Sequence, residues 1–222
     1  MNQKVLIDAM NKAGIIPVFN HKDVEATIKV MKVCHQAGLN VFEFTNRGDH
    51  SLSVFKELKK ASAHWEDFYL GIGTIFFKEQ AADFIEAGAD FLVSPVWDLE
   101  LAEYAKSQKI TWIPGIGTVS EAFQAFKFGI PLIKVFPANV LGPEFVASVK
   151  SVIPDLLVMP TGGVHPEEGN LKTWFDAGVH CVGMGSQLFS KVLIQEKQFE
   201  KLGDNINQAS GILNRFRNSS VK

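Results

Sequence analysis

The sequence has few cysteines, no long hydrophobic run and almost no net charge. Its 222 residues include two cysteines, Cys34 and Cys181, which lie in apolar contexts without metal-site spacing. We expect both to be buried, reduced thiols of a cytoplasmic protein. No apolar stretch approaches the roughly 18 residues that cross a membrane. The formal net charge of −2 offers no electrostatic basis for binding nucleic acid or anionic membranes.

Several functional signals are also missing. The six histidines show neither His-x-His nor His-x-x-x-His spacing, so we expect no metal site. The N-terminus lacks an apolar segment followed by a small-residue cleavage site, so no signal peptide is expected. There is no glycine-rich dinucleotide fingerprint and no P-loop. With 46% hydrophobic and 21% charged residues, the chain has an ordinary globular composition.

A short pattern repeats along the chain: a helix end, a glycine and an apolar run. Its four copies are 36–45, 86–95, 128–137 and 176–185. The glycine suits the left-handed position that ends a helix. Further apolar runs alternate with the copies, at 15–19, 69–73, 111–114 and 157–160. Helical patterns fill the gaps, among them 23–37, 51–63, 78–87, 99–108, 120–128 and 143–152.

Eight apolar strands that alternate with helices predict a parallel sheet covered by helices. This pattern favours a (β/α)8 barrel, the TIM barrel, as a single domain over residues 1–222. An open doubly wound sheet would require a glycine-rich turn after the first strand, where the chain has Asn20-His21-Lys22-Asp23. Residues from about 191 to 222 are predicted to pack outside as a last helix, through Phe199, Leu202, Ile206, Ile212, Leu213 and Phe216.

A lysine interrupts the apolar run 131–137. Because strand side chains alternate between faces, Lys134 shares a face with Leu132 and Phe136. A cation on an inward face is costly to bury unless its surroundings pair it or remove its charge. A neutral amine is a nucleophile toward carbonyl groups. Lys134 is therefore a candidate nucleophile, and the alternative is a surface lysine on a half-exposed strand.

Glu43 is the corresponding candidate in the second strand. Phe42 and Phe44 flank it and are predicted to face the outer helices, which turns Glu43 toward the barrel interior. We expect this carboxylate to meet the Lys134 amine across the barrel. The alternative is an ion pair that only fills the interior. Such buried pairs are often no more stabilising than hydrophobic packing, so the pair favours a catalytic use.

Glycine-rich turns follow three predicted strands, at the end where such barrels carry their active sites. Thr161-Gly162-Gly163 and Gly183-Met184-Gly185-Ser186 follow the seventh and eighth strands, the usual phosphate site. Gly71-Ile72-Gly73-Thr74, with Arg47 near it, is predicted to hold a carboxylate through backbone donors and a guanidinium. The alternatives are plain tight turns and, for Arg47, a simple surface position.

In their order along the chain, five segments resemble a known family, the bacterial 2-keto-3-deoxy-6-phosphogluconate aldolases, also called 4-hydroxy-2-oxoglutarate aldolases. The resemblance runs from about Ile15 to Leu188. The segments are Glu43-Phe44-Thr45-Asn46-Arg47, Gly71-Ile72-Gly73-Thr74, Ile113-Pro114-Gly115, Lys134-Val135-Phe136-Pro137-Ala138 and Pro160-Thr161-Gly162-Gly163.

The resemblance implies a (β/α)8 barrel assembled as a homotrimer, without metal or organic cofactor. It implies a lyase that cleaves the sugar acid to pyruvate and glyceraldehyde 3-phosphate, with Lys134 as the Schiff-base lysine and Glu43 as the acid/base residue. The remaining matched positions are expected to bind substrate. Arg47 and Thr74 would hold the pyruvate carboxylate, Thr161 would lie beside the imine, and the phosphate-binding turns would contain Gly162, Gly163, Gly185 and Ser186. We also expect Gly73, Pro95 and Phe136 to line the site.

Two departures from the family pattern bear on substrate choice. Ser94-Pro95 is followed by Val96 and Trp97 where the family commonly has a glycine, which would narrow the mouth. Asn20 stands where several members have a phosphate-binding arginine, which leaves backbone donors and Lys22 for that role. The aldehyde partner, the C4 configuration and the pathway stay open. The alternatives to an aldolase are another phosphate-binding barrel enzyme, an isomerase or synthase, and a non-catalytic binder of sugar-acid phosphates.

Overall fold

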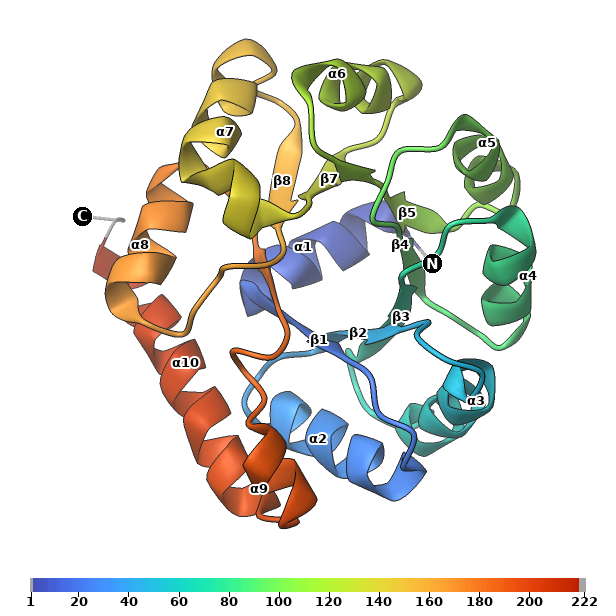
Figure 1. Cartoon of the computed structure of the whole chain (residues 1–222), viewed down its shortest axis with the longest axis vertical. Coiled ribbons are helices and arrows are strands. Elements are labelled where there is room, and N and C mark those ends of the chain that lie inside the picture. The colour runs from blue at the N-terminus through green and yellow to red at the C-terminus, as the bar shows by residue number, and fades with distance from the viewer. Residues whose placement is uncertain (1, 220–222) are drawn as a thin grey trace.

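Parallel strands curl around the centre of the computed structural model, which describes residues 2–219 (Figure 1). The side chain of Phe216 and residues 220–222, which belong to the predicted last helix, lie outside this description. All strand pairings among the described residues are parallel. The strands are β1 (Ile15–Phe19), β2 (Val41–Thr45), β3 (Tyr69–Gly73), β4 (Phe91–Val93), β5 (Thr111–Ile113), β6 (Gly115–Ile116), β7 (Leu132–Val135), β8 (Leu157–Pro160) and β9 (Val182–Met184).

The strands form two hydrogen-bonded sheets that adjoin at both edges. One has the order β5-β4-β3-β2-β1-β9 and the other β6-β7-β8. At one junction Thr161, just after β8, pairs with Gly183 of β9. At the other, only Pro114 separates β5 from β6, and its carbonyl accepts a hydrogen bond of 2.8 Å from the Lys134 amide. The predicted run 111–114 is thus split, because proline has no N–H for a continuous ladder.

Helices cover the outside of the curled sheet (Figure 1). The predicted parallel α/β architecture is confirmed, and so is the role of the repeated glycines. Gly38, Gly88, Gly129 and Gly178 have φ values of 80°, 89°, 92° and 91°, which side chains disfavour. The helices are α1 (Gln3–Ala13), α2 (Val24–Gln36), α3 (Ser51–Ser62), α4 (Lys78–Glu86), α5 (Leu99–Ser107), α6 (Val119–Phe128), α7 (Ala138–Val152), α8 (Glu168–Asp176), α9 (Lys191–Gln195) and α10 (Phe199–Ser219).

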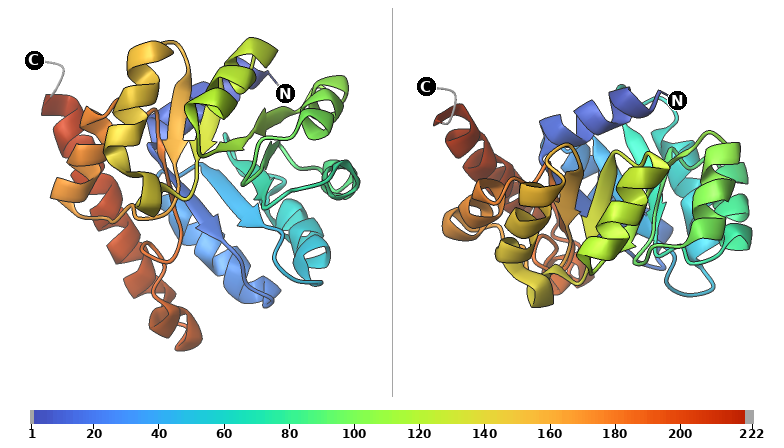
Figure 2. Two further views of the ribbon diagram at one scale, coloured as in Figure 1. Left: turned by 45° about the horizontal axis from the view of Figure 1, so that its top comes forward. Right: turned by 90° about the horizontal axis from the view of Figure 1, so that it is seen from above.

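Helix α1 was not predicted from the sequence, although it decides how the interior is filled. Leu6, Ile7 and Met10 on one of its faces are buried. They pack into an apolar cluster with residues from the starts of the strands, including Leu132 and Cys181. Figure 2 shows α1 lying across one end of the strands. The helix therefore closes the amino-terminal end of the sheet, which leaves the opposite end for a site.

The chain after β9 forms the predicted last helix, with the short α9 before it. Leu202, Ile206 and Leu213 of α10 are buried, and α10 packs against α2. Cys34 and Cys181 are free and buried, and burial raises the pKa of the Cys34 thiol. Within the described range, no helix combines the length and apolar character needed to cross a bilayer.

Candidate active site

Lys134 and Glu43 meet inside the curled sheet, as the alternation of side chains predicts. Lys134 lies on β7 with 5% of its surface exposed, and Glu43 lies on β2 with none. The Lys134 Nζ atom is 3.4 Å from Glu43 Oε1. A tight ammonium–carboxylate hydrogen bond would be about 2.8 Å, so the amine is near the carboxylate without being clamped by it. Lys134 Nζ also lies 5.5 Å from the centre of the Phe136 ring, two residues along the strand.

Gly73, at the end of β3, makes room for the Glu43 carboxylate. A Cβ atom at this glycine would lie 1.8 Å from Glu43 Oε1. Gly183 plays a similar part beside Thr161, whose Oγ1 would lie 2.2 Å from an added Cβ. Both approaches are far below van der Waals contact. These glycines are therefore required by the packing of the site, whereas sequence analysis placed Gly73 in a substrate-binding turn.

Gly73→Ala should lower kcat about tenfold or more, because the new methyl group would push the Glu43 carboxylate away from the Lys134 amine. Steady-state kinetics, with circular dichroism to check folding, would measure this. Gly211→Ala is the matched control, since nothing lies within 4 Å of a Cβ there. An alanine variant at Gly73 with unchanged kcat would show that the position of the carboxylate does not matter.

Two of the predicted site residues carry a buried polar atom without a hydrogen-bond partner. Among the described residues, three buried side-chain atoms have no hydrogen-bond partner: Glu43 Oε2, Thr161 Oγ1 and Ser51 Oγ, the last on α3. Leaving a buried polar group unpaired costs roughly 1–3 kcal/mol. Glu43 Oε2 belongs to the carboxylate beside Lys134, and Thr161 lines the cavity described next, so both atoms are consistent with a site that completes its hydrogen bonds with a ligand.

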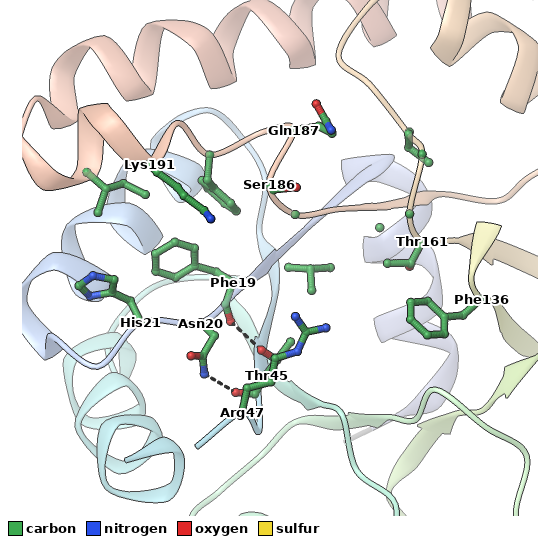
Figure 3. Close-up of a pocket in the computed structure, with 18 of the residues that line it drawn as sticks. Phe19, Asn20, His21, Thr45, Arg47, Phe136, Thr161, Ser186, Gln187 and Lys191 are labelled. Carbon is green, nitrogen blue, oxygen red and sulfur yellow. Dashed lines mark hydrogen bonds between the residues drawn. The ribbon is translucent and has the colours of Figure 1, made fainter. Parts of the chain in front are cut away.

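A cavity of about 560 Å³ opens at the carboxyl ends of the strands. Its wall includes Phe136, whose ring lies against Lys134, but neither Lys134 nor Glu43 itself. Figure 3 shows Arg47 directed toward its centre, with Phe136 and Thr161 on one wall. No aspartate or glutamate occurs among the described residues that line it, while Arg47 and Lys191 are both cationic. Neither cation forms an ion pair with a described residue. The cavity is therefore complementary to an anionic ligand.

The predicted site residues fall into three groups. Seven of them line the cavity, namely Arg47, Phe136, Thr161, Gly162, Gly163, Gly185 and Ser186. Asn20, at one of the departures from the family pattern, also lines it. Lys134, Glu43 and Gly73 pack against one another within the sheet. Thr74 and Pro95 are not in the cavity wall. Thr74 follows β3 with a φ of 63°, and the backbone of Pro95 lies against Gly115.

The residues at the two departures from the family pattern have local roles. Val96 is exposed, and Trp97 packs on Trp112 and Phe128 with ring centres 5.5 and 5.9 Å away, so neither lines the cavity. The Asn20 amide donates to the Thr45 carbonyl at 2.7 Å and lies 3.3 Å from His50. Asn20 thereby ties the end of β1 to the end of β2.

Sequence reasoning missed part of the cavity wall. It left out Thr45, buried at the end of β2, although that residue sits inside a quoted motif. His21 was assigned no role and Lys191 only a place in the tail, yet both line the cavity. Lys22, expected to assist with phosphate, is exposed and is not part of the wall. The turn after β9, which returns Lys191 to the strand ends, leaves no periodic pattern in the sequence.

Within residues 2–219, no three His, Cys, Asp or Glu side chains cluster as metal ligands would.

The site combines a buried amine–carboxylate pair with a cavity complementary to anions, and it lies at the carboxyl ends of curled parallel strands. These features define an enzyme of the α/β class. Comparison with known proteins narrows this class. Residues 6–205 match the family model described as KDPG and KHG aldolase. The chain belongs to this family, as the sequence motifs predicted, and it is an aldolase and hence a lyase.

Individual relatives agree with the family assignment. The chain is 32% identical to the 2-dehydro-3-deoxy-phosphogluconate aldolase of Pseudomonas aeruginosa PAO1, over 82% of this chain and 81% of that protein. It is 35% identical to the 2-dehydro-3-deoxy-6-phosphogalactonate aldolase of Escherichia coli K12, over 57% of this chain and 62% of that protein. It superposes on the KDPG aldolase of Legionella pneumophila with a TM-score of 0.84 at 25% identity, covering 91% and 97% of the two chains. That crystal structure holds pyruvate as a covalent carbinolamine intermediate.

Proposed function

We propose that this protein cleaves 2-keto-3-deoxy-6-phosphogluconate, or a closely related 4-hydroxy-2-oxo acid, to pyruvate and an aldehyde through a Schiff base on Lys134. For the phosphorylated substrate the aldehyde is glyceraldehyde 3-phosphate. The observation that carries the proposal is the buried Lys134 amine 3.4 Å from the Glu43 carboxylate. The pyruvate adduct of the Legionella relative, and that protein's name, support both the reaction and the substrate class.

In the first step, the Lys134 amine attacks the C2 ketone of the substrate. The carbonyl oxygen leaves as water, and a protonated imine joins the nitrogen to C2. Glu43 lies close enough to move protons to and from the amine and the departing oxygen. Phe136, whose ring faces the amine, keeps this nitrogen in a partly apolar environment.

In the second step, the Glu43 carboxylate takes the proton of the C4 hydroxyl and the C3–C4 bond breaks. The electron pair of that bond moves into the imine, forms an enamine, and leaves C4 as the carbonyl carbon of the aldehyde. Glu43 then returns a proton to C3, and water hydrolyses the imine to release pyruvate and free Lys134. The unpaired Oε2 atom of Glu43 is the acceptor available for the hydroxyl proton.

Residues of the cavity wall hold the ends of the substrate. We assign the pyruvate carboxylate to Arg47, whose guanidinium has no ion-pair partner among the described residues. Thr161 Oγ1 lies beside the reacting carbon in this arrangement. The phosphate lies at the turns containing Gly162, Gly163, Gly185 and Ser186. We keep Thr74 as a second group for the pyruvate carboxylate, and Gly73 and Pro95 as residues that line the site.

The assay that tests this proposal couples pyruvate release to lactate dehydrogenase. The phosphorylated gluconate and galactonate acids, which differ in configuration at C4, would be compared with 4-hydroxy-2-oxoglutarate. We expect pyruvate from all cleaved substrates and a kcat/KM at least about tenfold higher for a phosphorylated acid, since charge-assisted hydrogen bonds contribute about 1.5–3 kcal/mol. No pyruvate from any of the three would contradict the proposal.

We further propose that the strands close into an eight-stranded (β/α)8 barrel. Support comes from the Thr161–Gly183 bridge between β8 and β9 and from the continuity of β5 and β6 through Pro114. In this arrangement β5 and β6 count as one strand. Residues 1–222 would form one domain, with the segment from about 191 onward as a helical tail. A cytoplasmic location also stays a prediction.

A homotrimer is the assembly we propose, and exposed apolar side chains support it. Phe77 is 64% exposed, and Leu99 and Phe123 are each 55% exposed. They lie in consecutive strand–helix units at α4, α5 and α6, which are neighbours in Figure 1. Large exposed apolar patches commonly mark contacts between proteins. Two further copies of the chain would cover this face.

Phe77→Asp should convert trimers to monomers, because a buried, unpaired carboxylate opposes association. Light scattering coupled to size-exclusion chromatography would give the masses. Val152→Asp is the control, since Val152 is 63% exposed and is the last residue of α7, outside the three units that carry Phe77, Leu99 and Phe123. A trimer unaffected by Phe77→Asp would place the interface elsewhere, and a monomeric parent protein would remove the proposed assembly.

A further inference from the structure

The wall of the cavity opposite Phe136 and Thr161 carries a cation that the mechanism above does not use. Figure 3 shows Lys191 entering this wall from the start of α9, near Phe19 and His21. We propose that Lys191, assisted by His21, binds the terminal phosphate of the aldehyde half and sets the preference for phosphorylated acceptors. This inference rests on the proposed function and names the residues that select its substrate.

Charge supports the assignment to Lys191. Its ammonium forms no ion pair with any described residue, whereas six other lysines of residues 2–219 each pair with a carboxylate. The cavity that it lines has no carboxylate among its described residues. An unpaired cation in a concave, partly apolar wall raises the local concentration of anions and favours an anionic group there.

The hydrogen bonds of His21 make it a donor toward the same region. Its Nδ1 atom is 3.1 Å from the Asp23 amide, which can only donate, so Nδ1 accepts. In a neutral imidazole the other nitrogen, Nε2, then carries the proton. The ring is stacked on Phe19, with centres 6.2 Å apart and planes 17° apart, which limits its rotation. His21 therefore offers an oriented N–H donor in the same cavity wall as Lys191.

Other residues near the end of β1 are not available for this role. The Asn20 side chain is engaged with the Thr45 carbonyl and with His50. Lys22 and Lys191 are both exposed, but only Lys191 lines the cavity. Lys191 thus supplies the positive charge that the first strand lacks, from a segment far away in sequence.

The geometry favours a phosphate over a carboxylate. The lining residues with donors come from three segments: His21 follows β1, Gly162 and Gly163 follow β8, and Ser186 and Lys191 lie between the end of β9 and the start of α9. Donors from several directions match the oxygens of a tetrahedral dianion, whereas a planar carboxylate is satisfied by a single forked partner. Arg47 already provides that forked partner for the pyruvate end.

The test compares Lys191→Met with Lys22→Met in the condensation direction. With pyruvate and glyceraldehyde 3-phosphate, Lys191→Met should raise the KM for the aldehyde phosphate at least about tenfold and weaken its salt dependence. Lys22→Met should stay within about twofold of the parent. With glyoxylate as acceptor, both variants should behave like the parent. His21→Leu should raise the KM for glyceraldehyde 3-phosphate by a smaller factor, about threefold, as expected for a neutral donor.

Two further measurements separate this inference from the proposed function. Exchange of the pyruvate methyl protons with deuterated water needs the imine but no aldehyde, so Lys191→Met should leave it unchanged. Binding of inorganic phosphate, followed by calorimetry, needs no catalysis and should weaken in Lys191→Met.

If the parent exchanges protons but Lys191→Met has an unchanged KM for glyceraldehyde 3-phosphate, the inference is overturned and the proposed function stands. An equal effect of Lys191→Met on glyoxylate would overturn the assignment to phosphate. If the parent showed no exchange, the proposed function would fall, and unaltered phosphate binding in Lys191→Met would then overturn this inference independently.

Discussion

Replacing Lys134 with alanine is expected to lower the rate of aldol cleavage by about three orders of magnitude or more. The substitution removes the nitrogen that forms the imine, and with it the electron sink for C3–C4 cleavage. Losses of this size are typical when an enzyme loses its nucleophile. The measurement is kcat/KM for 2-keto-3-deoxy-6-phosphogluconate in the coupled assay.

Loss of folding must be separated from loss of chemistry, because Lys134→Ala leaves the Glu43 carboxylate buried without its cation. Breaking a buried pair in this way costs about 3–5 kcal/mol. Lys134→Arg keeps the positive charge but cannot form the imine, so it should be folded and equally inactive. The double variant Lys134→Met/Glu43→Gln removes both charges and should regain stability without activity. Turnover retained by any of these folded variants would exclude the imine mechanism.

Glu43→Gln should reduce cleavage by about 10²–10⁴-fold, the usual contribution of general acid–base catalysis. The amide preserves the size of the side chain beside Gly73 but cannot take the C4 hydroxyl proton. Because Lys134 is intact, we expect the variant still to form an imine with pyruvate, at a lower rate. Single-turnover kinetics would follow imine formation and C–C cleavage separately.

The split between these two steps is the informative result for Glu43. Glu121→Gln serves as a surface control, since Glu121 accepts hydrogen bonds from the Gly117 amide and the Thr118 hydroxyl at the start of α6 and does not line the cavity. Kinetics of Glu43→Gln that match the parent in both steps would assign the acid/base role to another group.

Local patterns in the sequence predicted much of the fold and the centre of the site. Side-chain alternation in β2 and β7 placed Glu43 and Lys134 on inward faces, and they meet there. The repeated glycines marked four helix ends correctly, because only the left-handed backbone at those positions continues the chain into a strand. These features depend on residues close together in sequence, which is why one chain was enough to find them.

Features that depend on long-range packing were not predicted. Helix α1 has an ordinary amphipathic pattern, but its closing of one end of the sheet follows from packing with residues as distant in sequence as Cys181. Lys191 looks like a surface residue of a polar tail until the turn after β9 brings it to the cavity. Thr74 and Pro95 are absent from the cavity wall, as are Lys134 and Glu43, so their roles in substrate binding stay predictions.

The most direct test of the account is borohydride reduction of the protein in the presence of pyruvate, followed by peptide mass mapping. We predict one reduced pyruvyl adduct, on the peptide that contains Lys134, and none in Lys134→Arg. Lys191 and Lys22 should remain unmodified. A folded, unmodified protein after this treatment, or an adduct on a different lysine, would contradict the Schiff-base assignment to Lys134. An unmodified protein would also favour an isomerase or synthase that uses Glu43 as a base and Lys134 only as its electrostatic partner.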